Sequence, residues 1–288
     1  MLATNAERKL LVGLIGAGIQ QSLSPAMHEE EARHHGIRLH YQLIDLDRLH
    51  AGVESLPTLI AAARMMDFAG LNITYPCKQA VIPILDDLTD ESRAMGAVNS
   101  VVFRNGKSIG HNTDGPGWSW AFKRAMPNAD LSRVVLLGAG GAGSAIAHAA
   151  LSLGVKQLVV IDLDSQRAME LVKNLNARYG PRATIGSDAA TAMSDANGLI
   201  HATPMGMEKF PGLPVPAETL RPDVWVSEVV YFPIETALLR AARARGCATI
   251  DGGSMAVGQA ASAFELFTGI APHAARMEAH CRRIIAAR

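Results

Sequence analysis

Short apolar runs alternate with helix-like segments along the whole chain, and this pattern predicts two α/β layers. In the first part of the chain, apolar runs predict strands at residues 10–15, 41–45, 69–74, 98–103 and 108–110. Helices are predicted at residues 25–36 and 55–66, the first with Ser24 as N-cap and Pro25 at the first helical position. The alternation is typical of an open α/β layer.

A second α/β unit is predicted from about residue 115. Its expected strands are residues 134–137, 157–161, 183–185, 198–202, 224–229 and 248–250. Helical segments fall between them, as the right-handed crossovers of a parallel sheet require. After Asp251 we expect helix through to Arg288, a tail long enough to pack back on the first part. The expected fold is therefore α/β with two domains and a cleft between them: residues 1–113 completed by 254–288, and residues 114–253.

A glycine-rich turn separates the strand at residues 134–137 from the helix that follows it. The turn consists of Gly138, Ala139, Gly140, Gly141, Ala142 and Gly143. Glycines allow backbone to approach a pyrophosphate, and the helix dipole favours its negative charge. The second domain is therefore predicted to be a Rossmann-type dinucleotide-binding domain. The residues before it are left to bind the substrate.

Asp162 ends the next strand, at the position where an acidic residue can bind the adenosine ribose hydroxyls. A 2′-phosphate would bring about −1.5 to −2 charges beside it. At ~4 Å and an effective dielectric near 20, each like-charge unit costs roughly 4 kcal/mol before screening. We therefore expect NAD to be preferred over NADP by about two decades or more, unless Arg167 pairs with the phosphate. The alternative role for Asp162 is that of a helix N-cap.

Composition narrows the class of partner. Lys plus Arg and Asp plus Glu each number 27, so no basic surface for nucleic acid or an anionic membrane is expected. The three cysteines and ten histidines lack metal-ligand or redox spacing, which favours a reducing compartment and no metal. We find no signal-like N-terminus and no apolar run near 18 residues, so we expect a soluble, cytoplasmic protein. Whether it is a monomer or a homodimer stays open.

Several ordered polar motifs lie in the first domain and near the C-terminus. They are S-x-S-P at 22–25, G-x-N-x-T-x-P-x-K at 70–78, G-A-x-N at 96–99, G-x-N-T-D at 110–114, and Asp-Gly at 251–252 followed by Gln-Ala at 259–260. Together with the glycine turn, they make the chain similar to the shikimate/quinate dehydrogenase family over nearly its whole length.

The resemblance implies roles for individual residues. Ser22 and Ser24 would hold the substrate carboxylate. Lys78 and Asp114 would form the catalytic pair, and which of the two is the base stays open. The other positions it implies are Thr74, Asn99 and Gln259 at ring hydroxyls, Tyr231 near the substrate, and Thr203, Val229 and Gly252 around the nicotinamide.

The chain departs from the family pattern at two places. Residues 202–207, around Thr203, depart from the Asn-Ala-Thr version common in the family. NADP-dependent members carry Asn-Arg-Thr at the end of the second strand, where this chain has Asp162, Leu163 and Asp164. The arginine that clamps the 2′-phosphate is thus replaced by Leu163, and NAD-preferring members often accept quinate as well as shikimate.

The expected function is NAD-dependent oxidation of quinate or shikimate, or both, to 3-dehydroquinate and 3-dehydroshikimate. The alternatives are a strictly biosynthetic shikimate dehydrogenase, an aminoshikimate-type relative, and a non-catalytic NAD- or ligand-sensing protein of the same fold. Taken alone, Lys78 would be read as a solvated surface residue. Cys77 is expected to be a packed thiol and Asn72 a residue that supports its loop.

Overall fold

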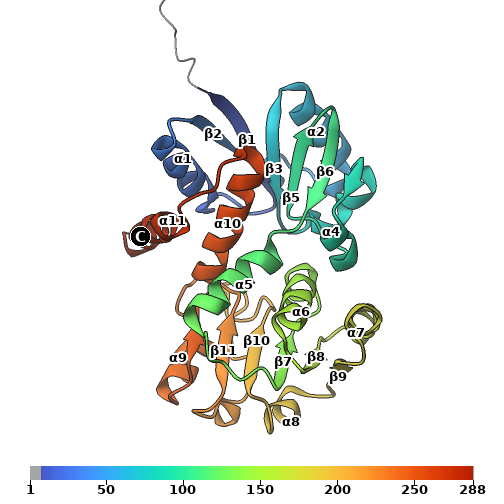
Figure 1. Ribbon diagram of the computed structural model, residues 1–288, viewed down its shortest axis with the longest axis vertical. Coiled ribbons are helices and arrows are strands. Elements are labelled where there is room, and N and C mark those ends of the chain that lie inside the picture. The colour runs from blue at the N-terminus through green and yellow to red at the C-terminus, as the bar shows by residue number, and fades with distance from the viewer. Residues whose placement is uncertain (1–7, 288) are drawn as a thin grey trace, which may run out of the picture. The chain divides into compact units, whose positions relative to one another are not determined.

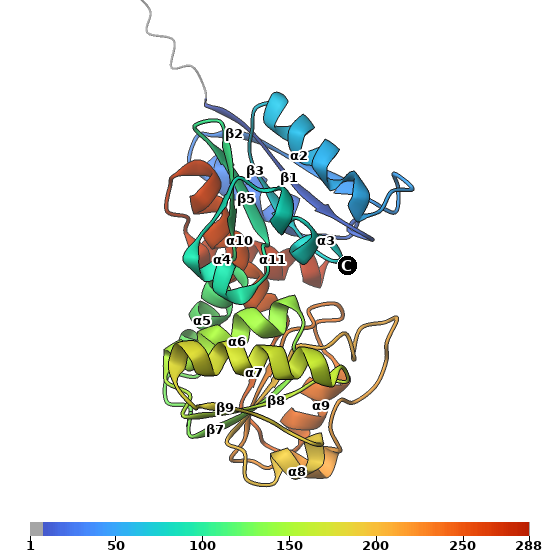
Figure 2. The same ribbon diagram turned by 90° about the vertical axis from the view of Figure 1, so that its right-hand side faces the viewer.

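A computed structural model describes residues 8–287, and it divides the chain into two compact units. Unit 1 combines the chain up to Thr113 with the C-terminal segment from Gln259, and unit 2 runs from Asp114 to Gly258. Figures 1 and 2 show the helices and strands of each unit in two views. Within residues 8–287, every helix is too short or too polar to cross a lipid bilayer.

Unit 1 contains a mixed six-stranded sheet. Its strands are β1 (Lys9–Gly16), β2 (Arg38–Asp45), β3 (Phe68–Ile73), β4 (Asp87–Leu88), β5 (Ser100–Arg104) and β6 (Lys107–His111). Its helices are α1 (Ser24–His34), η1 (Val53–Ser55), α2 (Leu56–Met65), α3 (Cys77–Ala80), η2 (Ile82–Ile84), α4 (Asp90–Met95), the C-terminal part of α10 (Gly252–Thr268) and α11 (Ala274–Ala286). The strand order is β2-β1-β3-β5-β6-β4. β1 runs parallel to β2 and β3, whereas β5 runs antiparallel to β3 and β6.

Both faces of this sheet are covered because successive residues of a strand point to opposite sides. Ile15 of β1 packs with Ile60 of α2, whereas Leu14 packs with Phe267 of α10 on the other face. A Cβ at Gly70 in β3 would overlap the Phe267 ring. The close approach of α10 to the sheet therefore depends on glycine at that position.

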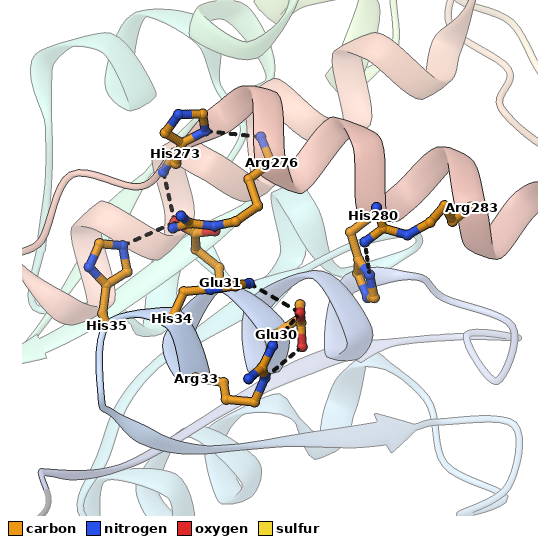
Figure 3. Close-up of polar contacts among 9 residues, drawn as sticks. All are labelled: Glu30, Glu31, Arg33, His34, His35, His273, Arg276, His280 and Arg283. Atoms are coloured by element: carbon orange, nitrogen blue, oxygen red, sulfur yellow. Dashed lines mark hydrogen bonds and ion pairs between the residues drawn. The ribbon is translucent and has the colours of Figure 1, made fainter.

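The C-terminal helix α11 is fastened to α1 by a buried carboxylate, that of Glu31 (1% exposed). It accepts hydrogen bonds from the backbone N–H of His273 at 2.7 Å and from Nε and Nη2 of Arg276 at 2.8 and 2.6 Å (Figure 3). Burial by itself raises the pKa of Glu31. The hydrogen bonds from Arg276 and His273 outweigh that effect and hold the pKa below its ordinary value. Glu30, by contrast, pairs with the exposed Arg33 on its own helix.

Unit 2 contains a parallel six-stranded sheet. Its strands are β7 (Arg133–Leu137), β8 (Gln157–Ile161), β9 (Ala183–Ile185), β10 (Gly198–His201), β11 (Trp225–Glu228) and β12 (Thr249–Ile250). Its helices are α5 (Asp114–Ala125), α6 (Gly141–Leu153), α7 (Ser165–Tyr179), α8 (Ala189–Met193), η3 (Ala217–Thr219), α9 (Ala237–Ala244) and the first turns of α10. The order β9-β8-β7-β10-β11-β12 is that of the Rossmann fold, and it reverses between β7 and β10. Ligands of such sheets bind outside the carboxyl ends of the strands at this reversal.

Helices cover both faces of the unit 2 sheet. Val134 and Leu136 of β7 pack with residues of α5, α6 and α7, whereas Val135 and Leu137 pack with residues of α8 and α9. β7 is apolar on both sides, as a central strand of a doubly covered parallel sheet must be. The α/β fold class expected from the sequence is confirmed.

Two local predictions are wrong. Ser24 is the first residue of α1 rather than its N-cap; Leu23 occupies that position with helical backbone angles (φ −85°, ψ −7°) and without a side-chain cap. The turn starts early because Ser22 Oγ accepts the Ser24 N–H at 3.2 Å. The predicted C-terminal helix is also interrupted, since α10 ends at Thr268 and Gly269 follows in the left-handed region (φ +72°). Arg288 lies outside the described residues.

Candidate functional site

The three glycines of the GxGxxG turn in unit 2 meet different steric conditions. Gly138 has a φ of +101°, and a Cβ there would lie 2.7 Å from the Ala202 carbonyl oxygen. A Cβ at Gly143 would overlap the carbonyl oxygen of Gly138. At Gly140, a Cβ would meet no atom within 4 Å. The turn is therefore packed tightly at its ends and open in the middle.

This geometry fits a pyrophosphate. Gly140 precedes α6, whose first turn presents backbone N–H groups that have no partner within the helix. In a GxGxxG turn the first glycine makes the tight turn, the second lets phosphate approach and the third allows helix and strand to pack closely. The space around each of the three glycines agrees with that division of roles. Gly141 and Ala142 continue the turn into α6 and are half-buried.

Asp162 follows β8 directly and is tied to the glycine turn. Its Oδ2 accepts the N–H of Ala139 at 2.6 Å, and its Oδ1 accepts the N–H of Asp164 at 2.9 Å. The N-cap of α7 is Asp164, whose side chain accepts the Arg167 N–H, so the alternative role of Asp162 as the N-cap is wrong. The Arg167 guanidinium lies 3.5 Å from the Asp164 carboxylate. Leu163, between the two carboxylates, is fully exposed.

The predicted nicotinamide residues lie at the carboxyl ends of β10 and β11, with Gly252 beside them. Thr203 is half-buried and follows β10. Val229 follows β11, and its N–H donates to the His201 carbonyl oxygen at 3.0 Å. A Cβ at Gly252 would overlap the Val229 carbonyl oxygen, so the start of α10 lies against this loop. Tyr231 comes two residues after Val229 in the sequence, and its side chain is 41% exposed.

In unit 1, three of the predicted substrate residues lie at the same end of the sheet strands. Thr74 follows β3 and its N–H donates to Ile15 of β1 at 2.9 Å. Asn99 precedes β5, and its carbonyl oxygen accepts the Ile73 N–H at 2.8 Å. Lys78 lies in α3, and its carbonyl oxygen accepts the Val98 N–H at 2.9 Å. The carboxyl ends of β1 and β3 and the start of β5 therefore bring these three residues together.

A network of hydrogen bonds between buried amides and hydroxyls holds the strands together at this end of the sheet. Asn99 Oδ1 accepts the Thr113 N–H at 2.8 Å, and Asn99 Nδ2 lies 3.0 Å from Thr113 Oγ1. Asn72 accepts a hydrogen bond from the Tyr41 hydroxyl at 2.8 Å and donates one to Ser100 Oγ at 3.0 Å. Asn72 therefore joins β2, β3 and β5, which agrees with a supporting role.

The remaining predicted residues are placed as follows. Ser22 and Ser24 share one turn before α1, where Ser22 Oγ already accepts the Ser24 N–H. Gln259 is half-buried in α10. Asp114 is fully buried at the first residue of α5. Lys78 belongs to unit 1 and Asp114 to unit 2, so their pairing stays a prediction.

The structure also bears on the chemistry of cysteine and metals. Cys77 is fully buried, and desolvation raises the pKa of its thiol to about 11, which agrees with a packed thiol. Among residues 8–287, no group of three or more His, Cys, Asp and Glu side chains could hold a metal ion.

Two buried residues near the predicted nicotinamide residues were missed by the sequence analysis. His201 ends β10 and Glu228 ends β11, and the two side chains are hydrogen-bonded at 2.9 Å. The departure from the family pattern near Thr203 was the only signal in the sequence. Their contact depends on the pairing of β10 with β11, in which His201 lies opposite Glu228.

The comparisons with known proteins identify the family of the chain. The family model "Shikimate dehydrogenase substrate binding domain" matches residues 14–101. A shikimate dehydrogenase (NADP(+)) from Streptomyces avermitilis is 54% identical over 270 residues, covering 93% of each chain. A quinate/shikimate dehydrogenase (NAD(+)) from Corynebacterium glutamicum (strain R) is 46% identical over 272 residues, covering 93% of this chain and 96% of the relative.

Solved structures agree as well. A quinate dehydrogenase from Corynebacterium glutamicum in complex with NAD superposes with a TM-score of 0.91 at 43% identity, covering 96% of this chain and 99% of the other. Similarity of sequence and of structure thus extends over both units. The chain belongs to the shikimate/quinate dehydrogenase family.

Proposed function

We propose that the protein is an NAD-dependent dehydrogenase that oxidises quinate, shikimate or both. The observation that carries the choice of NAD is the end of β8. There the Asp162 carboxylate is held by two backbone N–H groups, and the exposed Leu163 stands where NADP-dependent members carry an arginine. The carboxylates of Asp162 and Asp164 would thus face a 2′-phosphate, and the guanidinium of Arg167 is already paired with Asp164.

The electrostatic argument favours NAD. A 2′-phosphate of about −1.5 to −2 charges at ~4 Å from Asp162 would be repelled by roughly 4 kcal/mol per charge unit at an effective dielectric near 20. Arg167 would reduce this repulsion only slightly, because its guanidinium already lies 3.5 Å from the Asp164 carboxylate and both side chains are about half exposed to solvent. We expect NAD to bind about two decades more tightly than NADP. The names of the relatives are divided on this point, since the Streptomyces avermitilis enzyme is named for NADP and the Corynebacterium glutamicum enzyme for NAD.

On the substrate side, the residues suit a hydroxylated ring acid. The hydroxyls of Ser22 and Ser24 would hold the carboxylate, helped by the N-terminus of α1. Lys78 would contact the reacting ring hydroxyl, and Asp114 would share the proton that this hydroxyl loses. The remaining ring hydroxyls would be bound by Thr74, Asn99 and Gln259. When bound, the nicotinamide supplies the hydride acceptor.

Three alternatives remain to be tested against this proposal. A strictly biosynthetic shikimate dehydrogenase would use NADP and reject quinate. An aminoshikimate-type relative would prefer an amino-substituted ring. A sensing protein of the same fold would bind NAD without turnover.

The deciding experiment is NADH or NADPH formation with quinate and with shikimate, each with NAD and with NADP, at neutral and alkaline pH. We expect turnover of one or both acids with NAD at least about 100-fold more efficient than with NADP. The matched variant is Leu163→Arg, which should improve kcat/KM for NADP and leave the choice of acid unchanged. Efficient turnover of shikimate with NADP by the unaltered protein would refute the NAD assignment. Absence of turnover with every acid, despite NAD binding, would favour the sensing protein.

A further inference from the structure

A buried chain of hydrogen bonds joins β10, β11 and the loop that carries Thr203. His201 is 0% and Glu228 1% exposed. His201 Nδ1 lies 2.9 Å from Glu228 Oε1, and His201 Nε2 lies 2.6 Å from Thr203 Oγ1. The carboxylate, imidazole and hydroxyl therefore form a continuous series that ends at a half-buried residue of the predicted nicotinamide site.

The partners of Glu228 determine which ring nitrogen of His201 carries the proton. Glu228 Oε1 accepts the backbone N–H groups of Val229 and Val230 at 2.8 and 2.9 Å, and Oε2 accepts the Thr236 hydroxyl at 2.9 Å. All of these groups donate, so Glu228 acts as an acceptor only. These acceptor roles favour a hydrogen on His201 Nδ1, directed toward Glu228. In the neutral ring, Nε2 is left as an acceptor.

This tautomer fixes the orientation of the Thr203 hydroxyl. With His201 Nε2 as the acceptor, the Thr203 hydroxyl donates its hydrogen to it, and the oxygen then accepts from any other partner. It already accepts the N–H of Met205 at 3.3 Å, which holds the start of the following loop. One lone pair of Thr203 Oγ1 remains for a ligand, and it selects a group that carries an N–H or O–H.

We propose that His201 and Glu228 are positioning residues, which hold Thr203 so that its oxygen accepts a hydrogen bond from the amino group of the nicotinamide carboxamide. The inference rests on the proposed function, because it assumes that the nicotinamide lies beside Thr203. It also gives Glu228 a second task, since the same carboxylate holds the backbone of Val229 and Val230. The two loops at the carboxyl ends of β10 and β11 are thus set by one carboxylate.

The test compares three ligands on the purified full-length chain by calorimetric titration. NAD has the carboxamide, 3-acetylpyridine adenine dinucleotide has a methyl in place of its amino group, and ADP-ribose lacks the ring. The variants are Thr203→Val, which removes the hydroxyl, Thr203→Ser, which keeps it, and His201→Asn, whose side chain is too short to reach both Glu228 and Thr203. Thr219→Val is the control, because the Thr219 hydroxyl bonds only locally, to Pro216.

We expect the unaltered protein, Thr203→Ser and Thr219→Val to bind NAD about fivefold more tightly than the acetylpyridine analogue, as one hydrogen bond allows. In Thr203→Val and His201→Asn this preference should fall to within about twofold, with ADP-ribose binding unchanged. An undiminished preference in Thr203→Val, or an equal loss for all three ligands, would overturn the inference. If either result is found while the unaltered protein oxidises its acids with NAD, only the positioning role of His201 and Glu228 is refuted, and the proposed function stands. If the unaltered protein binds no dinucleotide, the positioning role and the proposed function are both refuted.

A spectroscopic measurement tests the orientation without any ligand. Nitrogen-15 NMR distinguishes the two neutral tautomers of histidine, and the His201→Asn spectrum assigns the His201 signal. We expect the hydrogen on Nδ1. A hydrogen on Nε2 would leave Thr203 free to donate and would overturn the inference even if the variants lose affinity.

Discussion

Substitutions at two glycines of the glycine turn should affect different properties, one the affinity for the cofactor and the other the stability of the fold. At Gly140 the backbone is extended (φ −72°, ψ −170°), a conformation open to any residue, and a Cβ would meet no atom within 4 Å. Gly140→Ala should therefore change the free energy of unfolding by less than about 1 kcal/mol. Gly143→Ala should lower the free energy of unfolding by more. Its Cβ would overlap the backbone of Gly138, which cannot move aside as a flexible side chain would.

The expected magnitudes follow from these contacts. In Gly140→Ala, a methyl group would stand where the proposed pyrophosphate approaches, and we assume that two charge-assisted hydrogen bonds of about 1.5–3 kcal/mol each are lost or stretched. That corresponds to a loss of roughly 10²–10⁴ in affinity for NADH. In Gly143→Ala the overlap should cost roughly 3 kcal/mol or more, which lowers Tm by about 6 °C or more.

The assay combines thermal unfolding without ligand and titration with NADH followed by fluorescence. Gly140→Ala should unfold like the unaltered protein and bind NADH poorly, whereas Gly143→Ala should lose stability first. Normal NADH affinity in a folded Gly140→Ala protein would refute the assignment of this turn to the pyrophosphate. A large loss of stability in Gly140→Ala would refute the reading of open space at that position.

Three further predictions concern the substrate unit. Lys78→Ala should lower kcat by ~10²–10⁴ with NADH affinity nearly unchanged, because its proposed role is in proton transfer; initial rates and a titration decide, and a near-normal rate contradicts the assignment. Glu31→Gln should lower Tm more than the control Glu30→Gln, because the Glu31 carboxylate that binds Arg276 is buried, whereas Glu30 pairs with an exposed arginine. The lowered pKa of Glu31 means that its contribution is complete above the ordinary carboxyl pKa and is lost as pH falls through the folded-state pKa. The Tm values of Glu31→Gln and the unaltered protein should therefore converge in acid, and a constant difference would contradict this. Cys77→Ser should retain activity and Cys77 should react slowly with thiol reagents at pH 8, because burial raises the pKa of its thiol to about 11; rapid labelling would show an open site instead.

The sequence by itself determined the features that depend on neighbouring residues. The apolar runs predicted the main strands of both sheets, because a strand buried on both faces has to be apolar throughout. The glycine turn and Asp162 were recognisable because strand, turn, helix and the next strand follow one another in a fixed order. Weak local signals failed, as at β4, which has only two residues, and at Ser24, where a hydrogen bond to Ser22 moved the start of the helix.

Contacts between distant residues were decided only by the tertiary structure. His201 and Glu228 are 27 residues apart, and they meet because β10 and β11 pair in parallel with these residues opposite each other. Glu31 and Arg276 are 245 residues apart, and their bond depends on α11 returning to α1. A buried carboxylate is stable only when donors surround it, and the packing of distant segments, rather than any local pattern, supplies those donors.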